Sequence, residues 1–192
     1  MNLPSVIKRL HTLQQELERV NLWDAVLALG CTPCKNILFI GAVGALNENM
    51  KIGNIAIPDY SICGTGADRY LTSGNVSESD SYGKKYYPNK ELSDKVLKVT
   101  NESIKDKDIK TYIGKVFSSD TIFAEYAHLD EFMNMGCDIV EMETATLFNA
   151  ANVVGINASA VCNISDNTMA NKSLYNVRTV ADQQRRSKVK KR

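Results

Sequence analysis

The sequence has no apolar run long enough to cross a membrane and no recognisable export signal. Its 192 residues contain no uninterrupted stretch of apolar residues approaching the roughly 18 that a membrane-spanning helix needs. The segment that opens the chain, MNLPSVIKRLHTLQQELERV, carries charges throughout, whereas a secretory signal needs a continuous apolar core. These absences argue against a membrane-spanning protein and predict a cytoplasmic one.

Cysteine is scarce, and its count is odd. The chain has five cysteines, and an odd number does not fit a complete disulfide framework. Cys63, Cys137 and Cys162 lie in apolar, strand-like segments, which predicts buried, reduced thiols. Cys31 and Cys34 form a Cys-x-x-Cys pair, but no second ligand pair stands at the spacing of a zinc site. A thioredoxin-like pair would follow a strand, whereas this one precedes a predicted strand, so we interpret both as incidental loop cysteines.

The sequence also lacks internal repeats, a clear interdomain linker and a large net charge. The net charge is +1, with 44% hydrophobic and 23% charged residues, a composition typical of a globular protein. We therefore predict one domain over residues 1–192. Six of the last eight residues are basic, and no aromatic residue stands among them. We interpret residues 185–192 as a solvated helix end, with nucleic-acid binding as the less favoured alternative.

The most informative segment runs from residue 137 to residue 166. A short apolar stretch leads into Glu141 and Glu143, and residues 144–154 then show the apolar spacing of a helix. Gly155 suits the end of that helix, because glycine adopts the left-handed conformation without cost. A second apolar stretch ends at Asp166. Two buried strands joined by a helix predict parallel pairing, with the carboxylates of Glu143 and Asp166 along one rim of the sheet.

Apolar spacing and turn residues predict the other elements. Helices are expected over residues 3–20, 23–29 and around 129–133. Strands are expected over residues 35–40 and 109–117, and over 53–58, where Pro58 ends the strand and residues 60–63 continue it. A Gly-x-x-Gly turn is expected over residues 41–44 and a long polar loop over 71–90. Asn89 is a suitable N-cap for the helix that follows this loop.

Small or acidic residues stand at four predicted strand ends, namely Gly41, Ser118, Glu143 and Asp166. If all four strands are parallel neighbours, these residues share one crevice. The alternative is that such residues only terminate strands and cap helices, as they often do.

Three segments in order resemble the nucleoside phosphorylase family: ILFIGAVGALNENMKIGNIAIPD, GKVFSSD and DIVEMETATLFNAANVVGINASAVCNISD. That family includes purine nucleoside phosphorylases, uridine phosphorylases and adenosylhomocysteine-type nucleosidases. The VEMET and SD motifs are the most specific part, and the similarity covers about residues 36–166. The resemblance implies a mixed α/β fold with a partly closed central sheet flanked by helices. It also implies a homo-oligomer that binds a nucleoside or nucleobase and uses phosphate as co-substrate, without another cofactor.

The resemblance assigns roles to individual residues. Glu143 resembles the carboxylate that binds the ribose 2′ and 3′ hydroxyls, and Met142 the side chain against the sugar. Asp166 resembles the acid that protonates or hydrogen-bonds N7 of a purine base. The remaining substrate-binding residues that the resemblance implies are Gly44 and Ser165 beside the base, Val140 as a wall of its pocket, Ile122 or Phe123 stacked on it, and Arg178. These roles fit the chemistry, because cleavage of an N-glycosidic bond builds positive charge on the sugar and negative charge on the base.

Departures from the family pattern concern phosphate. Phe39 and Ala42 stand where phosphorolytic members carry an Arg and a Ser or Thr that bind phosphate, and neither side chain offers a donor to an anion. The family's first strands, with their phosphate loop, would precede Met1, which would also expose an edge of the sheet. The sequence therefore resembles an N-terminally shortened or divergent member. Hydrolytic cleavage by water and nucleoside binding without catalysis are the alternatives.

Overall fold

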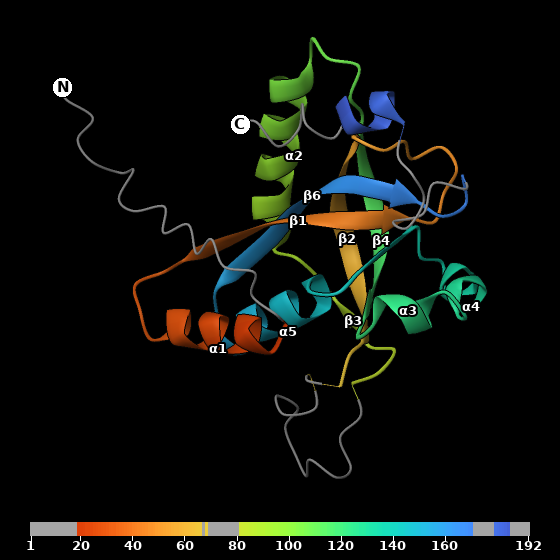
Figure 1. Ribbon diagram of the computed structural model, residues 1–192. Coiled ribbons are helices and arrows are strands. Elements are labelled where there is room, and N and C mark those ends of the chain that lie inside the picture. The colour runs from red at the N-terminus through yellow and green to blue at the C-terminus, as the bar shows by residue number, and fades with distance from the viewer. Residues whose placement is uncertain (1–18, 67, 69–80, 171–178, 185–192) are drawn as a thin grey trace, which may run out of the picture.

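The structure is a computed structural model that describes residues 19–66, 68, 81–170 and 179–184 (Figure 1). The helices are α1 (Arg19–Gly30), α2 (Lys90–Ile104), α3 (Ile122–Glu125), α4 (Leu129–Asn134) and α5 (Thr144–Val154). The strands are β1 (Asn36–Ala45), β2 (Ile55–Gly64), β3 (Lys85–Tyr86), β4 (Thr111–Ser119), β5 (Ile139–Glu141) and β6 (Asn157–Asn167). Arg178, the basic residues 185–192 and most of the predicted helix over 3–20 lie outside the described residues. No described helix has the length and apolarity to span a bilayer.

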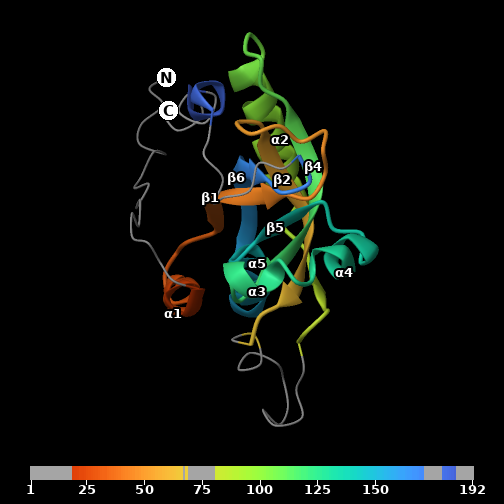
Figure 2. The same ribbon diagram turned by 45° about the vertical axis from the view of Figure 1, so that its right-hand side comes forward.

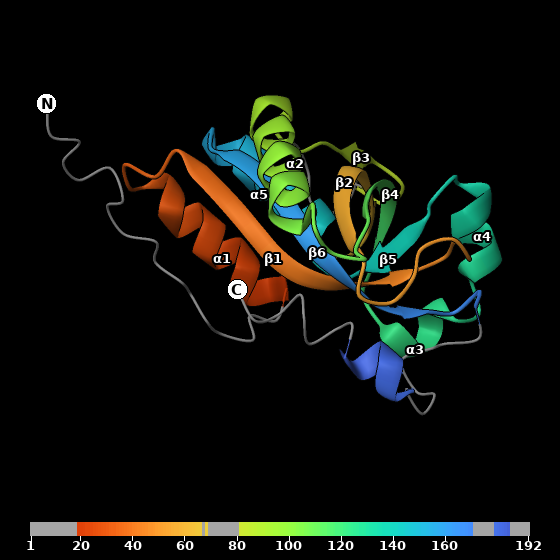
Figure 3. The ribbon, with the colours of Figure 1, turned by 90° about the horizontal axis from the view of Figure 1, so that it is seen from above.

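The strands form a closed, mixed barrel with one additional strand. Their order is β3-β2-β4-β5-β1-β6, and β6 pairs again with β2, which closes the sheet. The pairs β1–β6, β2–β4 and β4–β5 are parallel, whereas β1–β5, β2–β3 and β2–β6 are antiparallel. Helices flank the barrel on several sides (Figures 1 and 3). The predicted mixed, partly closed sheet flanked by helices is confirmed.

The largest apolar cluster lies between the barrel and the pair of helices α1 and α5, which run side by side (Figure 1). Its members include Trp23 and Val26 of α1 and Leu147 and Phe148 of α5, packed against Ile164 of β6. On α1 the buried side chains lie on one face, whereas α5 is buried on all sides from Thr144 to Ala151. Burial of these apolar side chains supplies the main stabilisation of the layer.

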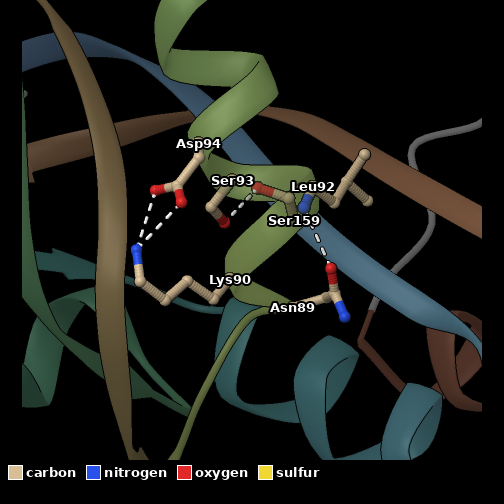
Figure 4. A network of polar contacts seen from close by, with 6 residues as sticks. All are labelled: Asn89, Lys90, Leu92, Ser93, Asp94 and Ser159. Carbon is tan, nitrogen blue, oxygen red and sulfur yellow. Dashed lines mark hydrogen bonds and ion pairs between the residues drawn. The ribbon is translucent and has the colours of Figure 1, made fainter.

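Helix α2 packs against β6 on the other side of the barrel (Figure 1). Asn89 is its N-cap as predicted, because the side-chain oxygen accepts a hydrogen bond from the Leu92 N–H at 2.9 Å (Figure 4). The hydroxyls of Ser93 and Ser159 lie 2.8 Å apart and join α2 to β6 (Figure 4). The cap therefore fixes where α2 begins, and the serine pair fixes its position on the strand.

The predicted parallel pairing of the two strands around α5 is wrong. β1 lies between β5 and β6, parallel to β6 but antiparallel to β5. β5 has only three residues and pairs with β4 and with the end of β1. A crossover helix limits the distance between two strands but does not make them neighbours, and here the closed barrel admits β1 between them. The four strand ends named above are consequently not parallel neighbours.

The predicted Gly-x-x-Gly turn over residues 41–44 is also wrong. β1 runs on through both glycines to Ala45 and stays paired with β6 along its whole length. A Cβ atom on Gly41 would collide with the Phe39 ring. The glycines therefore serve close packing within a strand, a use that sequence does not distinguish from a turn.

The remaining predictions were confirmed in part. β2 (Ile55–Gly64) is one strand that passes through Pro58, with a register shift between Pro58 and Tyr60, whereas the sequence predicted that the strand ends at Pro58 and continues from Tyr60. The short strand β3 was missed inside the predicted loop over 71–90, of which residues 71–80 lie outside the described part. Cys63, Cys137 and Cys162 are buried, free thiols as predicted.

The outer edge of β1 is open in the described part of the chain. From Asn36 to Val43 it pairs only with β6, and β5 joins it at Gly44 and Ala45. Leu38 and Ile40 are 47% and 76% exposed on this segment.

Candidate active site

Three of the predicted site residues meet across neighbouring strands. Gly44 of β1 is the register partner of Asp166 on β6 and of Val140 on β5. A Cβ atom built on Gly44 would lie 3.0 Å from Oδ2 of Asp166 and 3.2 Å from Cγ2 of Val140. The acid and the apolar wall therefore flank a glycine that leaves space between them.

A bulge in β6 directs the Asp166 side chain. Val43 pairs with Ile164 and Gly44 with Asp166, so Ser165 is an extra residue in the strand. The Ser165 hydroxyl hydrogen-bonds Oδ1 of Asp166 at 2.6 Å and also lies 3.2 Å from the Val43 carbonyl oxygen. Asp166 is only 6% exposed. The predicted pair Ser165 and Asp166 thus forms one buried polar unit beside Gly44.

Glu141 has a structural task at the first turn of α5. One carboxylate oxygen accepts hydrogen bonds from the N–H groups of Glu143 and Thr144, both at 2.7 Å. The other accepts from the hydroxyls of Ser118 and Thr144. Burial raises the pKa of the Glu141 carboxyl, while these hydrogen bonds lower it. Glu141 therefore satisfies the free N–H groups at the start of α5.

Met142 and Glu143 lie at the entrance to α5 and remain half-buried. Glu143 occupies the N-cap position, but its side chain makes no capping hydrogen bond. The first N–H groups of α5 are therefore bonded by Glu141 and not by Glu143. Both residues follow closely on Val140, one wall of the site.

Sequence reasoning missed one acid, Glu125 at the end of α3. Its Oε2 accepts a hydrogen bond from the Ser119 hydroxyl at 2.8 Å. Burial raises the pKa of Glu125, Ser119 opposes the shift, and the charges of Asp166 and Glu141 raise the pKa further. This electrostatic coupling places Glu125 near the candidate site. A helix of four residues is too short to leave a periodic signal in the sequence.

Ile122 and Phe123 also belong to α3, which lies on the same side of the barrel as α4 (Figure 2). Phe123 is 77% exposed and Ile122 is half-buried. The stacking of Ile122 or Phe123 on a base stays a prediction. Arg178 lies outside the described residues.

The two positions assigned to phosphate point to opposite faces of β1. Ala42 is exposed on the face that also holds Gly44, whereas the Phe39 ring packs against the main apolar cluster. The alternation of side chains along a strand requires this separation. Phe39 and Ala42 therefore do not form one anion site. The strands β1, β5 and β6 contain no cationic residue.

The Phosphorylase superfamily profile matches residues 21–190. The chain belongs to this superfamily.

Its sequence is similar to those of bacterial enzymes described as purine nucleoside phosphorylase, DeoD-type. The chain is 31% identical to the one from Shewanella sp. (strain MR-4) and 25% identical to the one from Geobacillus stearothermophilus, over 135 residues in each case. These alignments cover 69% and 70% of this chain and 52% and 53% of the relatives. The chain thus spans about half the length of the curated relatives it matches.

Solved structures share the fold at lower identity. A Plasmodium knowlesi homologue of the P. falciparum PNP has a TM-score of 0.65 at 17% identity, covering 88% of this chain and 64% of that one. The 5′-methylthioadenosine/S-adenosyl homocysteine nucleosidase of Campylobacter jejuni has a TM-score of 0.64 at 15% identity, covering 88% and 70%. An AMP nucleosidase from Bacteroides thetaiotaomicron has a TM-score of 0.62 at 23% identity, covering 77% and 60%. At these identities the similarity shows the fold and does not choose between reactions.

Proposed function

We propose that this chain binds a purine nucleoside and cleaves its N-glycosidic bond in the manner of the nucleoside phosphorylases. The observation that supports this best is the meeting of Asp166, Gly44 and Val140 on three neighbouring strands. Glu143 follows three residues after Val140 at the start of α5. A base and a ribose are the ligand parts that such an arrangement of an acid, an apolar wall and a second acid would accommodate.

Each acid stabilises one of the two charges that develop in the reaction, the negative charge on the base or the positive charge on the sugar. Asp166, in its protonated form, donates to N7 of the base as the glycosidic bonding electrons move onto the ring. Glu143, as a carboxylate, accepts hydrogen bonds from the ribose 2′ and 3′ hydroxyls and stabilises the positive charge that develops on the sugar. Met142 packs against the sugar, while Val140 and the backbone at Gly44 contact the base. Ser165 holds the carboxyl of Asp166 in place.

The acceptor of the ribosyl group is phosphate in this proposal, and water is the second candidate. The specific observation that favours water is the apolar chemistry of Phe39 and Ala42, which offer no charged or hydroxyl donor to phosphate. Copies of the chain are proposed to assemble into a homo-oligomer, as the family resemblance implies.

Base release from inosine and adenosine, measured by chromatography with and without phosphate, tests the proposal. We expect release by the wild-type chain, and a loss of at least about 100-fold in Asp166→Asn and Glu143→Gln. Glu102→Gln on the exposed face of α2 is the matched control and should retain full activity. Release that requires phosphate supports phosphorolysis, and release without phosphate supports hydrolysis. Nucleoside binding in calorimetry without any release would contradict catalysis by this chain.

A further inference from the structure

The carboxylate of Asp68 joins the segment after β2 to helix α5, away from the site described above. Asp68 is fully buried. It accepts hydrogen bonds from Nδ2 of Asn149 at 2.8 Å, from the Thr146 hydroxyl at 3.1 Å and from the Thr65 hydroxyl. A buried carboxylate is costly unless donors surround it. These donors therefore hold Asp68 firmly, and Asp68 in turn holds two residues of α5.

A second polar contact holds another side of the same helix. The hydroxyls of Thr144 and Ser61 of β2 lie 2.6 Å apart, and both side chains are fully buried. The apolar residues of α5, such as Leu147 and Phe148, pack in the main core cluster instead. Apolar packing is non-directional, whereas hydrogen bonds specify direction and distance. These polar contacts therefore set the rotation and axial position of α5, and its buried apolar side chains supply most of its stabilisation.

We propose that Asp68 is a positioning residue, which holds α5 so that Glu143 at its N-cap reaches the ribose. The proposal rests on the function proposed above for Glu143. Glu141 fixes the backbone N–H groups of the first turn, but a cap at one end does not prevent the helix from rotating about its axis. Asp68 accepts hydrogen bonds from Thr146 and Asn149, which lie on one side of α5 in its first two turns, and these contacts oppose such a rotation.

The test distinguishes a weaker contact with the ribose from a weaker contact with the base. Calorimetric titration of the full chain with inosine and with free hypoxanthine gives two dissociation constants for each variant. In Asp68→Asn and in Thr146→Val we expect inosine to bind about 3- to 10-fold more weakly, as for the loss of one or two hydrogen bonds, and hypoxanthine to bind within about 2-fold of the wild type. Asp94→Asn is the matched control, because Asp94 is an exposed acid of α2 that forms an ion pair with Lys90, and it should change neither constant.

A double-mutant cycle measures whether Asp68 and Glu143 affect inosine binding independently. If Asp68 acts through Glu143, the variant Glu143→Gln already lacks the ribose contact, and adding Asp68→Asn should weaken inosine binding by less than about 2-fold more. Equal weakening for inosine and hypoxanthine, or unchanged inosine binding by folded Asp68→Asn and Thr146→Val, would overturn the inference while leaving the proposed function intact. A wild-type chain that binds neither ligand would instead remove the proposed function, and the inference with it.

Discussion

At the scale of single residues, Gly44 separates the two side chains that would contact a base. A Cβ atom there would press on Oδ2 of Asp166 and Cγ2 of Val140 at 3.0 and 3.2 Å. Such distances require a shift of the acid, the wall or the strand. The small space that a glycine leaves at position 44 therefore lets Asp166 and Val140 keep their present positions.

We expect Gly44→Ala to weaken hypoxanthine binding at least about 10-fold, because the added methyl group occupies that space and displaces the acid. Gly66→Ala is the matched control, since its Cβ atom would meet only Oδ2 of Asp120, at 3.7 Å. Calorimetric titration of both variants measures the effect, and circular dichroism verifies that both are folded. Equal affinity in the two variants would mean that the base does not bind at Gly44.

The raised pKa of Glu125 predicts how the free energy of unfolding depends on pH. Its pKa is raised from the ordinary 4.5, first by burial, so the folded state binds the proton more tightly than the unfolded state. The free energy of unfolding then decreases as pH rises from the unfolded pKa through the raised folded pKa. Glu125→Gln, which mimics the protonated acid, should lose this decrease and gain stability relative to the wild type above that window.

Urea unfolding at pH 4 and at pH 7 measures this difference. The advantage of Glu125→Gln over the wild type should be larger at pH 7 than at pH 4. The exposed Glu102→Gln on α2 provides the comparison and should show no such trend. A constant difference at both pH values would show that burial does not shift the titration of Glu125.

At the scale of elements, the start of α2 depends on one side chain. Asn89 accepts the hydrogen bond from Leu92 N–H, and its amide also donates to Oδ1 of Asn157 at 3.0 Å. We expect Asn89→Ala to lower the free energy of unfolding by about 1 kcal/mol. Asp94→Asn breaks only the exposed pair with Lys90 and should cost less than about 0.5 kcal/mol.

Urea unfolding of the two α2 variants compares these costs directly. If Asn89→Ala were no less stable than Asp94→Asn, packing against β6 alone would determine where α2 begins. Neither substitution removes a hydroxyl of the nearby Ser93 and Ser159 pair (Figure 4), so we expect that pair to contribute equally in both variants.

At the scale of the whole molecule, a nucleoside should stabilise the fold, because its proposed contacts come from α5 and three strands of the barrel. Inosine at about 100 times its dissociation constant should add about 2.7 kcal/mol to the free energy of unfolding. Phosphate alone should leave the melting temperature unchanged, since β1, β5 and β6 offer no cation to it.

Differential scanning fluorimetry with inosine, with phosphate and with both tests this expectation, with sulfate as the control for non-specific salt effects. Stabilisation by phosphate alone, beyond that by sulfate, would reveal an anion site built from residues outside these three strands. Sedimentation of the same samples would show whether copies of the chain assemble.

Sequence alone determined the local features of this protein. Helix α5 with its Gly155 cap, the Asn89 cap of α2 and the buried cysteines follow from the identity of a few neighbouring residues, because spacing and capping act over one or two turns. The VEMET and SD motifs indicated the superfamily, and with it the mixed, partly closed sheet that the barrel confirmed.

Only the tertiary structure decided which distant segments meet. The insertion of β1 between β5 and β6, the strand through Gly41 and Gly44, and the approach of Glu125 to Asp166 depend on contacts between residues far apart in the chain. Closure of the barrel sets these contacts, and no local preference encodes it. β1 also continues to Ala45, beyond the end at residue 40 that the sequence predicted. Because side chains alternate along a strand, Phe39 and Ala42 lie on opposite faces of β1.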